Sequence, residues 1–149
     1  MSLPRVLTRP LPEALLAPLD GLCELEIVPP EASLAERDLA DVVGVICLLI
    51  DSLDSALLAR MPALSFASSV SVGVDHVDVA ALSARGIPLG HTPGVLVDTT
   101  ADLTFALLLA AARRVAESDR FVRDHQWLPD ERWSPGFFLG KDVSGATLG

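Results

Sequence analysis

Lysine is almost missing from this 149-residue sequence. Lys141 is its single lysine, beside ten arginines, and twenty acidic residues bring the net charge to −9 at pH 7. A protein that binds the phosphates of nucleic acid or the anionic surface of a membrane needs a basic face. The composition therefore argues against both of these partners, and solubility is the simplest interpretation of the acidity.

Cysteine is also scarce, and long hydrophobic runs are absent. Cys23 and Cys47 lie in apolar, strand-like segments without the C-x-x-C spacing, which predicts buried, reduced thiols rather than a disulfide or a metal pair. The longest apolar runs, Val42–Ile50 and Phe105–Ala112, are too short to span a bilayer. The N-terminal residues lack the apolar region of a signal peptide. We expect a soluble, cytoplasmic protein.

Strand and helix patterns alternate along the first ninety residues. The run 42–50 is apolar throughout, which is typical of a parallel strand covered on both faces, whereas residues 23–28 alternate and predict a half-buried strand near a sheet edge. Asp51 or Ser52 is the expected N-cap of one helix and Asp78 that of another. The alternation predicts an α/β fold with a doubly wound parallel sheet. The expected strands are 5–9, 23–28, 42–50, 63–70 and 87–90, and the expected helices are 12–19, a short one opening at 33–36, 51–61 and 78–86.

The pattern changes after residue 98. Residues 99–124 predict one long helix, with Thr99 and Asp102 forming a start that resembles a capping box. The stretch 103–112 is apolar almost all round, so we expect it to be buried between two bodies rather than laid on one surface. An irregular arm follows, and its aromatic residues are Trp127, Trp133, Phe137 and Phe138.

Two segments that follow expected strands are candidates for a binding site, because ligands of such sheets bind at the carboxyl ends of the strands. They are "SSVSVGVDHVD", residues 68–78, and "GHTPGV", residues 90–95. Gly73 has no Cβ and allows a ligand to approach the backbone. The amides of Val72 and Gly73, close to the expected helix start at Asp78, would suit a carboxylate or a phosphate. Tight packing of small residues in a strand-to-helix turn is the alternative interpretation.

Three other interpretations of single residues are less well supported. Asp75, His76 and Asp78 resemble a metal cluster, but strand alternation and the capping role of Asp78 argue against one. His76 has no acidic residue at helix spacing to orient it as a general acid–base, so a hinge or packing role is favoured. Asp51 ends the expected third strand, as the phosphoacceptor of a receiver domain would. The segments "TRP" and "GHTP" lack the acidic residues and the lysine that such a module needs.

The string "SVSVGVDHVDVAALSARGIPLGHTPGVLVDTTADLTFALLLAAARR", residues 69–114, resembles the D-isomer-specific 2-hydroxyacid dehydrogenases. It is most similar to their glyoxylate/hydroxypyruvate reductase branch, in which the form G-x-D-H-x-D is common. The resemblance covers residues 42–149 well and the first forty residues weakly. It implies a flavodoxin-like substrate (catalytic) domain over 1–98. Over 99–149 it implies a crossover helix, a dimerisation arm and the first strand of a truncated Rossmann domain.

The resemblance also implies an activity, the NAD- or NADP-dependent reduction of small 2-oxo acids such as glyoxylate and hydroxypyruvate to D-2-hydroxy acids. Val72 and Gly73 match the backbone pair that binds the substrate carboxylate, and Val72 and Thr100 match positions near the cofactor. The family's catalytic Arg, Glu and His and its glycine fingerprint have no counterpart here. We therefore expect no catalytic residue, no metal and no cofactor bound by this chain alone, which we expect to be inactive. His91 departs from the Asn that many members carry before Thr-Pro, and the sequence leaves the effect on specificity open.

Two further expectations concern the oligomeric state and whether the chain is part of a longer enzyme. The apolar helix and the arm predict a homodimer through residues 99–140, since family members are commonly dimers through this region. The last residues, "GATLG", match the run into the first Rossmann strand and suggest the N-terminal part of a longer enzyme. The alternative is a free-standing substrate-domain module with a binding or regulatory role and no catalysis. Sequencing the DNA beyond the stop codon distinguishes them, because only the first predicts a dinucleotide-binding fingerprint there.

Overall fold

The computed structural model describes residues 2–127 and 134–149. The chain divides into two compact units, Met1–Val95 and Leu96–Gly149, and each is considered by itself. Trp133, which the sequence assigned to the aromatic arm, lies outside the described residues.

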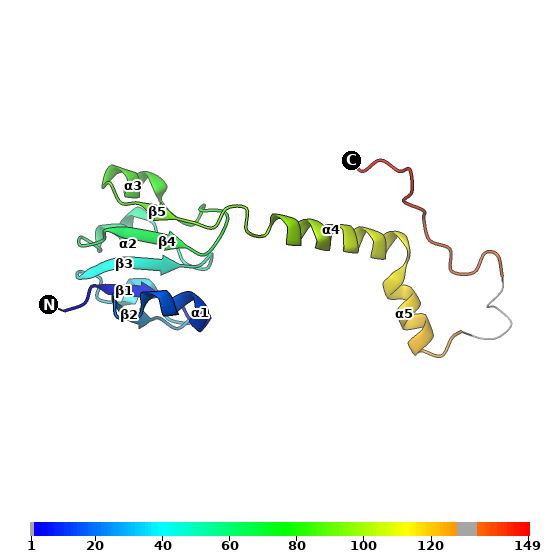
Figure 1. Cartoon of the computed structure of the whole chain (residues 1–149), viewed down its shortest axis with the longest axis horizontal. Coiled ribbons are helices and arrows are strands. Elements are labelled where there is room, and N and C mark those ends of the chain that lie inside the picture. The colour runs from blue at the N-terminus through cyan, green and yellow to red at the C-terminus, as the bar shows by residue number, and fades with distance from the viewer. Residues whose placement is uncertain (1, 128–133) are drawn as a thin grey trace. The chain divides into compact units, whose positions relative to one another are not determined.

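The first unit is built on a five-stranded parallel sheet (Figure 1). Its strands are β1 Arg5–Thr8, β2 Glu24–Ile27, β3 Val42–Cys47, β4 Phe66–Ser69 and β5 Leu89–Gly90. Their order in the sheet is β2-β1-β3-β4-β5, and all four neighbouring pairs are parallel. This is the strand order of flavodoxin-like folds. The predicted parallel α/β fold is confirmed, and β2 lies at an edge as its alternating pattern indicated.

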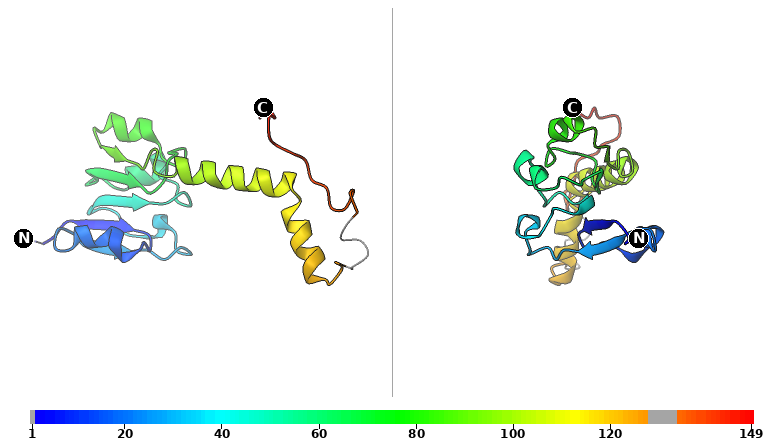
Figure 2. Two further views of the ribbon diagram at one scale, coloured as in Figure 1. Left: turned by 45° about the vertical axis from the view of Figure 1, so that its right-hand side comes forward. Right: turned by 90° about the vertical axis from the view of Figure 1, so that its left-hand side faces the viewer.

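Short helices flank the sheet on both faces (Figure 2). They are α1 Glu13–Leu16, which continues as the 3-10 turn η1 Ala17–Leu19, the 3-10 turn η2 Leu34–Glu36, α2 Ser55–Ala59 and α3 Val79–Ala84. Leu57 and Leu58 of α2 and Leu82 of α3 pack with Leu7, Val45 and Ala67 of the sheet in one buried cluster. The helix predicted over 12–19 contributes no buried residue, and Leu15 is exposed.

The strand predicted over 42–50 ends early, at Cys47. Asp51 causes this end, because its carboxylate accepts a hydrogen bond from the Leu48 amide at 2.9 Å while its own amide donates to the Leu48 carbonyl at 3.0 Å. The chain therefore turns, and Leu49 and Ile50 are exposed instead of buried.

Of the predicted helix caps, one is wrong and one is confirmed. Neither Asp51 nor Ser52 caps the helix after β3. That helix begins at Ser55, and Asp54 caps it by accepting a hydrogen bond from the Leu57 amide at 2.8 Å. Asp78 caps α3 through the Ala81 amide at 2.9 Å, as predicted.

The second unit contains two helices, α4 Val97–Ala112 and α5 Val115–Arg123, where the sequence predicted one. Arg114 adopts a left-handed backbone conformation with φ 55° and separates them. The arm returns to this break, since the Lys141 amide donates to the Ala112 carbonyl at 2.8 Å. A Cβ on Gly140 would lie 2.6 Å from the same oxygen, so only glycine fits against the end of α4.

The predicted start of the long helix is also wrong. Since α4 begins at Val97 after Leu96, Thr99 and Asp102 lie inside the helix and cap nothing. Neither α4 nor α5 contains a buried residue, and Leu103, Phe105 and Leu107 are each about 60% exposed. In the arm, Phe137 and Phe138 pack on Phe121, and the Arg114 guanidinium lies 4.5 Å above the Phe138 ring.

The strand predicted at the end of the chain is not formed, and residues 146–149 have no regular structure. A strand needs a neighbour to accept and donate its backbone hydrogen bonds, and in the part of the chain that is described this segment has none. Among the described residues, no helix combines the length and hydrophobicity needed to cross a membrane.

Candidate functional site

The candidate site is the loop Val70–Val77, which leaves the carboxyl end of β4. Its first residue is tied to β3, because the Val70 amide donates to the Cys47 carbonyl at 3.0 Å. Its last residues are tied to Leu53, whose amide donates to the His76 carbonyl and whose carbonyl accepts from the Asp78 amide, each at 2.9 Å. The loop is thus held at both ends, and the segment after β5 lies against its middle.

Three consecutive carbonyls of this loop are anchored. The Ser71 carbonyl accepts from the Thr92 amide at 2.9 Å, and the Val72 carbonyl accepts from His91 Nδ1 at 3.0 Å. The Gly73 carbonyl accepts from the Ser71 hydroxyl at 2.6 Å. In a trans peptide the N–H points opposite to the C=O of the same unit. Each anchored carbonyl therefore also sets the direction of the next residue's amide.

The amides that these carbonyls orient belong to Val72, Gly73 and Val74. None of the three donates to an acceptor within the described residues. Val72 and Gly73 are exposed, and a Cβ on Gly73 would meet only the Asp75 carboxylate, at 3.5 Å. Gly73 does not adopt a left-handed φ, so glycine here provides open space rather than unusual backbone freedom. A row of oriented, unpaired amides is suited to a carboxylate.

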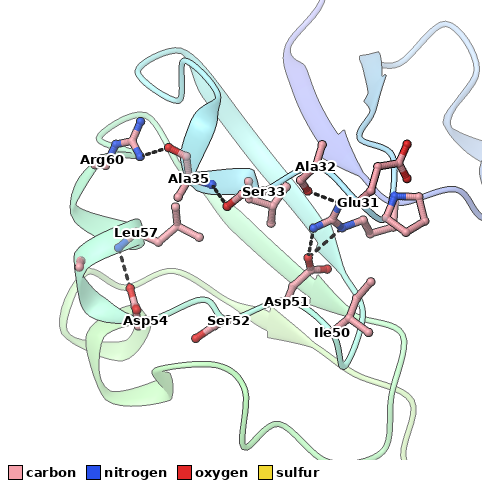
Figure 3. A pocket seen from close by; sticks show the side chains of 14 residues that line it. Glu31, Ala32, Ser33, Ala35, Ile50, Asp51, Ser52, Asp54, Leu57 and Arg60 are labelled. Atoms are coloured by element: carbon pink, nitrogen blue, oxygen red, sulfur yellow. Dashed lines mark hydrogen bonds and ion pairs between the residues drawn. The ribbon is translucent and has the colours of Figure 1, made fainter.

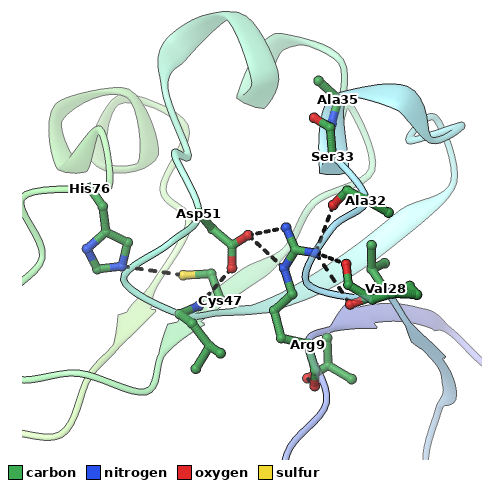
Figure 4. Close-up of polar contacts among 11 residues, drawn as sticks. Arg9, Val28, Ala32, Ser33, Ala35, Cys47, Asp51 and His76 are labelled. Carbon is green, nitrogen blue, oxygen red and sulfur yellow. Dashed lines mark hydrogen bonds and ion pairs between the residues drawn. The ribbon is translucent and has the colours of Figure 1, made fainter.

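A buried polar cluster lies under the loop. His76 Nε2 is 2.9 Å from the Ser69 hydroxyl, which is 2.6 Å from the Ser71 hydroxyl. The Cys47 sulfur is 3.8 Å from His76 Nε2 (Figure 4), and burial raises the pKa of its thiol, so Cys47 stays a neutral thiol and not a nucleophile. The sequence favoured a hinge or packing role for His76 and did not point to Ser69 or Ser71. The S-x-S spacing at the end of a strand, which puts both hydroxyls on one face, was the available signal.

No metal centre is present among the described residues, since none of their His, Cys, Asp and Glu side chains gather in groups of three or more. Asp78 is engaged as the cap of α3, and Asp75 is exposed. Asp75, His76 and Asp78 therefore do not form a metal-binding group in the described structure.

Asp51, weighed above as a phosphoacceptor, forms a buried ion pair with Arg9. Arg9 Nε and one terminal nitrogen lie 2.8 and 2.6 Å from Asp51 Oδ1 (Figure 4). The other terminal nitrogen donates to the carbonyls of Pro29 at 2.5 Å and Ala32 at 2.9 Å. One guanidinium thus joins the segments that follow β1, β2 and β3.

A cleft of about 540 Å³ lies beside this ion pair (Figure 3). Several of its polar side chains stabilise the fold: Asp54 caps α2, Ser33 accepts from the Ala35 amide at 3.2 Å, and Arg60 donates to the Ala35 carbonyl. These groups are already paired, so we do not assign a ligand to this cleft.

Of the residues predicted to bind, the structure places Val72 and Gly73 side by side in the anchored loop. Thr100 lies in α4 of the second unit, where its carbonyl accepts from the Thr104 hydroxyl at 2.7 Å. The sequence did not predict the residues that anchor the loop, Thr92, His91 and Ser71. The contacts of Thr92 and His91 join segments about twenty residues apart, which a local pattern does not record.

We expect His91→Leu to loosen the loop and His91→Asn to preserve it. Leucine removes the donor to the Val72 carbonyl, whereas the side-chain nitrogen of asparagine takes the position of Nδ1 and can donate in its place. The ¹⁵N order parameter of Gly73 should fall in the leucine variant only. A fall of equal size in both variants would contradict an anchoring role for this hydrogen bond.

The fold and the anchored loop together define the class, a parallel α/β domain of the kind that binds the substrate in D-2-hydroxyacid dehydrogenases. The sequence pattern of the D-isomer specific 2-hydroxyacid dehydrogenase family, catalytic domain, matches residues 6–147. The chain therefore belongs to this family of oxidoreductases.

Individual relatives agree. The glyoxylate reductase of Korarchaeum cryptofilum is 41% identical over an alignment that covers 98% of this chain and 45% of the relative. The glyoxylate reductase of Thermofilum pendens is 37% identical over an alignment that covers 100% of this chain and 45% of that protein. The chain thus spans about 45% of the length of these curated relatives.

A solved structure gives the same picture for the fold. The TT0316 protein of Thermus thermophilus superposes with a TM-score of 0.79 at 40% identity, covering 93% of this chain and 45% of that one. An NADPH-dependent glyoxylate/hydroxypyruvate reductase of Sinorhizobium meliloti, in complex with citrate, superposes with a TM-score of 0.69 at 31% identity. That match covers 85% of this chain and 40% of the other.

Proposed function

We propose that this chain supplies the substrate-binding part of an NAD- or NADP-dependent dehydrogenase that reduces glyoxylate or hydroxypyruvate to the D-2-hydroxy acid. The observation that carries the proposal is the row of three oriented, unpaired amides at Val72, Gly73 and Val74. The similarity to proteins named glyoxylate reductase supports the substrate class. The Sinorhizobium enzyme, solved with citrate and with NADP and malonate, supports small carboxylates and a nicotinamide cofactor.

The residues of this chain hold and orient the substrate. The carboxylate accepts hydrogen bonds from the Val72 and Gly73 amides, which fixes the 2-carbonyl relative to the loop. The Val72 side chain, 52% exposed beside these amides, gives an apolar contact. A nicotinamide cofactor supplies the hydride when it is bound, and we place Val72 and Thr100 near it. Asp75 is exposed beside Gly73, so its negative charge limits how tightly an anion binds.

We propose the following domain organisation. Residues 1–98 form the substrate domain, and residues 99–149 form a crossover segment, a dimerisation arm and the entry to a dinucleotide-binding domain that lies outside this chain. We also propose a cytoplasmic location, which the two free thiols Cys23 and Cys47 favour. No side-chain arrangement among the described residues specifically favours the free-standing module over the dehydrogenase.

We propose a homodimer through residues 99–140. The exposed Leu103, Phe105 and Leu107 of α4 would each gain about 1.5–3 kcal/mol from burial, which favours association with a second copy of the same helix. Light scattering after size exclusion at tens of micromolar should give at least twice the 15.7 kDa chain mass. A monomer would contradict the dimer and leave the substrate site untouched.

The substrate proposal is tested by calorimetry with a substrate analogue and with both nicotinamide cofactors. Oxamate, a stable analogue of a small 2-oxo acid, should give saturable heat with a dissociation constant in the millimolar range, corresponding to about −4 kcal/mol. NADH and NADPH should give none, because the sequence contains no G-x-G-x-x-G loop for the pyrophosphate. Absence of oxamate binding would contradict the substrate site. Tight NADH binding would contradict the proposal that a separate domain binds the cofactor.

A further inference from the structure

The buried cluster under the loop forms a hydrogen-bond chain whose direction can be worked out. It runs from His76 through Ser69 and Ser71 to the Gly73 carbonyl. A carbonyl oxygen only accepts, so the single hydroxyl proton of Ser71 points to Gly73. The Ser69 hydroxyl must then donate to Ser71, and its oxygen must accept from His76. The Ser69–Ser71 and Ser71–Gly73 contacts are both 2.6 Å, and Ser69 and Ser71 are buried.

The direction of the chain assigns the state of the imidazole. His76 Nε2 must carry the hydrogen of the bond that Ser69 accepts. The surroundings of Nδ1 favour a lone pair on that atom, because Nδ1 is buried without a hydrogen-bond partner among the described residues. An unpaired acceptor at that atom is tolerated more readily than an unpaired N–H would be. Cys47, 3.8 Å from Nε2, is a neutral thiol and competes only weakly for this contact.

The hydrogen-bond chain ends at the Gly73 carbonyl, the third of the anchored carbonyls in the loop. Gly73 has more backbone freedom than any other residue type, and its carbonyl belongs to the same peptide unit as the Val74 amide. The Ser71 hydroxyl therefore fixes the third of the three unpaired amides. Thr92 and His91 hold the carbonyls of the peptide units that contain the Val72 and Gly73 amides, so only the Val74 amide depends on the buried cluster.

We propose that His76 is a positioning residue for carboxylate binding, acting through Ser69 and Ser71 on the Gly73 carbonyl. This inference rests on the proposed function of the loop. His76 does not touch the substrate. Its Nε2–H donates the first hydrogen bond of a one-way chain that orients the Val74 amide as a third donor, in addition to the Val72 and Gly73 amides, and the chain fails wherever one member cannot donate.

The test uses the full ¹⁵N-labelled chain with oxamate as the probe. Imidazole nitrogen shifts first report the tautomer of His76, and oxamate affinity is then measured from the amide shifts of residues 72–74. We expect a protonated Nε2, and we expect His76→Leu and Ser71→Ala each to weaken oxamate binding about tenfold, the effect of one lost hydrogen bond to a charged ligand. His76→Gln should restore most of the affinity, because its side-chain nitrogen can occupy the place of Nε2.

The outcomes separate this inference from the proposed function. An Nε2 without a proton would overturn the direction of the hydrogen-bond chain whatever oxamate does. Unchanged affinity in the folded His76→Leu variant, with only its melting temperature lowered, would show a purely structural role and overturn the positioning role while the proposed function stands. If the leucine variant does not fold, the glutamine and Ser71→Ala variants decide by the same comparison. Absence of oxamate shifts in the wild type would overturn the proposed function and the positioning role with it.

Discussion

Replacing Asp51 with alanine should destabilise the first unit by about 3–5 kcal/mol, the effect of leaving a buried charge without its partner. The side chains of Arg9 and Asp51 are 6% and 1% exposed, so water cannot replace the lost carboxylate. The variant also removes the acceptor of the Leu48 amide, which shapes the turn after β3. Urea unfolding followed by circular dichroism measures the change in the free energy of unfolding.

A matched control comes from an exposed ion pair. Asp119 and Arg123 lie 2.9 Å apart on the surface of α5, and Asp119→Ala should change the free energy of unfolding by less than about 0.5 kcal/mol. The double variant Arg9→Met with Asp51→Leu should recover part of the loss, because no unpaired charge remains. Equal effects of Asp51→Ala and Asp119→Ala would contradict the role of the buried pair.

Replacing Gly73 with valine should lower oxamate affinity on the order of tenfold to a hundredfold and leave stability nearly unchanged. The side chain would cover the amides that the carboxylate must reach, and each hydrogen bond to a charged group contributes roughly 1.5–3 kcal/mol. Folding should tolerate it, because a Cβ at Gly73 meets only the Asp75 carboxylate at 3.5 Å and φ is not left-handed. Calorimetry gives the affinity, and urea unfolding gives the stability.

Gly136→Val is the control, since Gly136 is exposed and has no atom within 4 Å of its Cβ position. It should leave oxamate affinity unchanged. If Gly73→Val binds oxamate as well as the wild type does, the anion does not reach these amides. If it binds less only because it is unfolded, Gly73→Ala, with a smaller side chain, separates the two causes.

The parallel α/β class and the position of the loop could be predicted because they depend on local patterns. The apolar run 42–50, the alternation around Leu25 and the Asp78 cap are each recorded in a few consecutive residues. The end of β3 could not be predicted in the same way. It depends on Asp51, whose carboxylate is held by Arg9 forty-two residues earlier in the chain.

The break between α4 and α5 is a second case of a distant cause. The sequence around Arg113 and Arg114 contains no glycine or proline, so local propensity favours one continuous helix. The helix ends where the Lys141 amide reaches the Ala112 carbonyl and Gly140 packs against it. Tertiary contact overrides propensity here, and a single-sequence pattern does not record that contact.

The candidate site also combines features that the local sequence predicts with contacts that only the fold brings together. The sequence predicts an anion-binding turn at Gly73, and this stays a prediction, while the structure shows open space around Gly73. The three anchors that orient its amides come from Thr92, His91 and the Ser71 hydroxyl, and only the folded chain brings them to successive carbonyls. The sequence thus singled out Val72 and Gly73, and the structure supplies the contacts that orient their amides.

The most direct test of the account is a titration of the ¹⁵N-labelled wild-type chain with oxamate, followed by the backbone amide shifts. We expect the amides of Val72, Gly73 and Val74 to shift most and to saturate together in the millimolar range. Shifts centred on the cleft beside Arg9 and Arg60, or no saturable shift in the loop, would contradict the claim that this loop binds the substrate carboxylate.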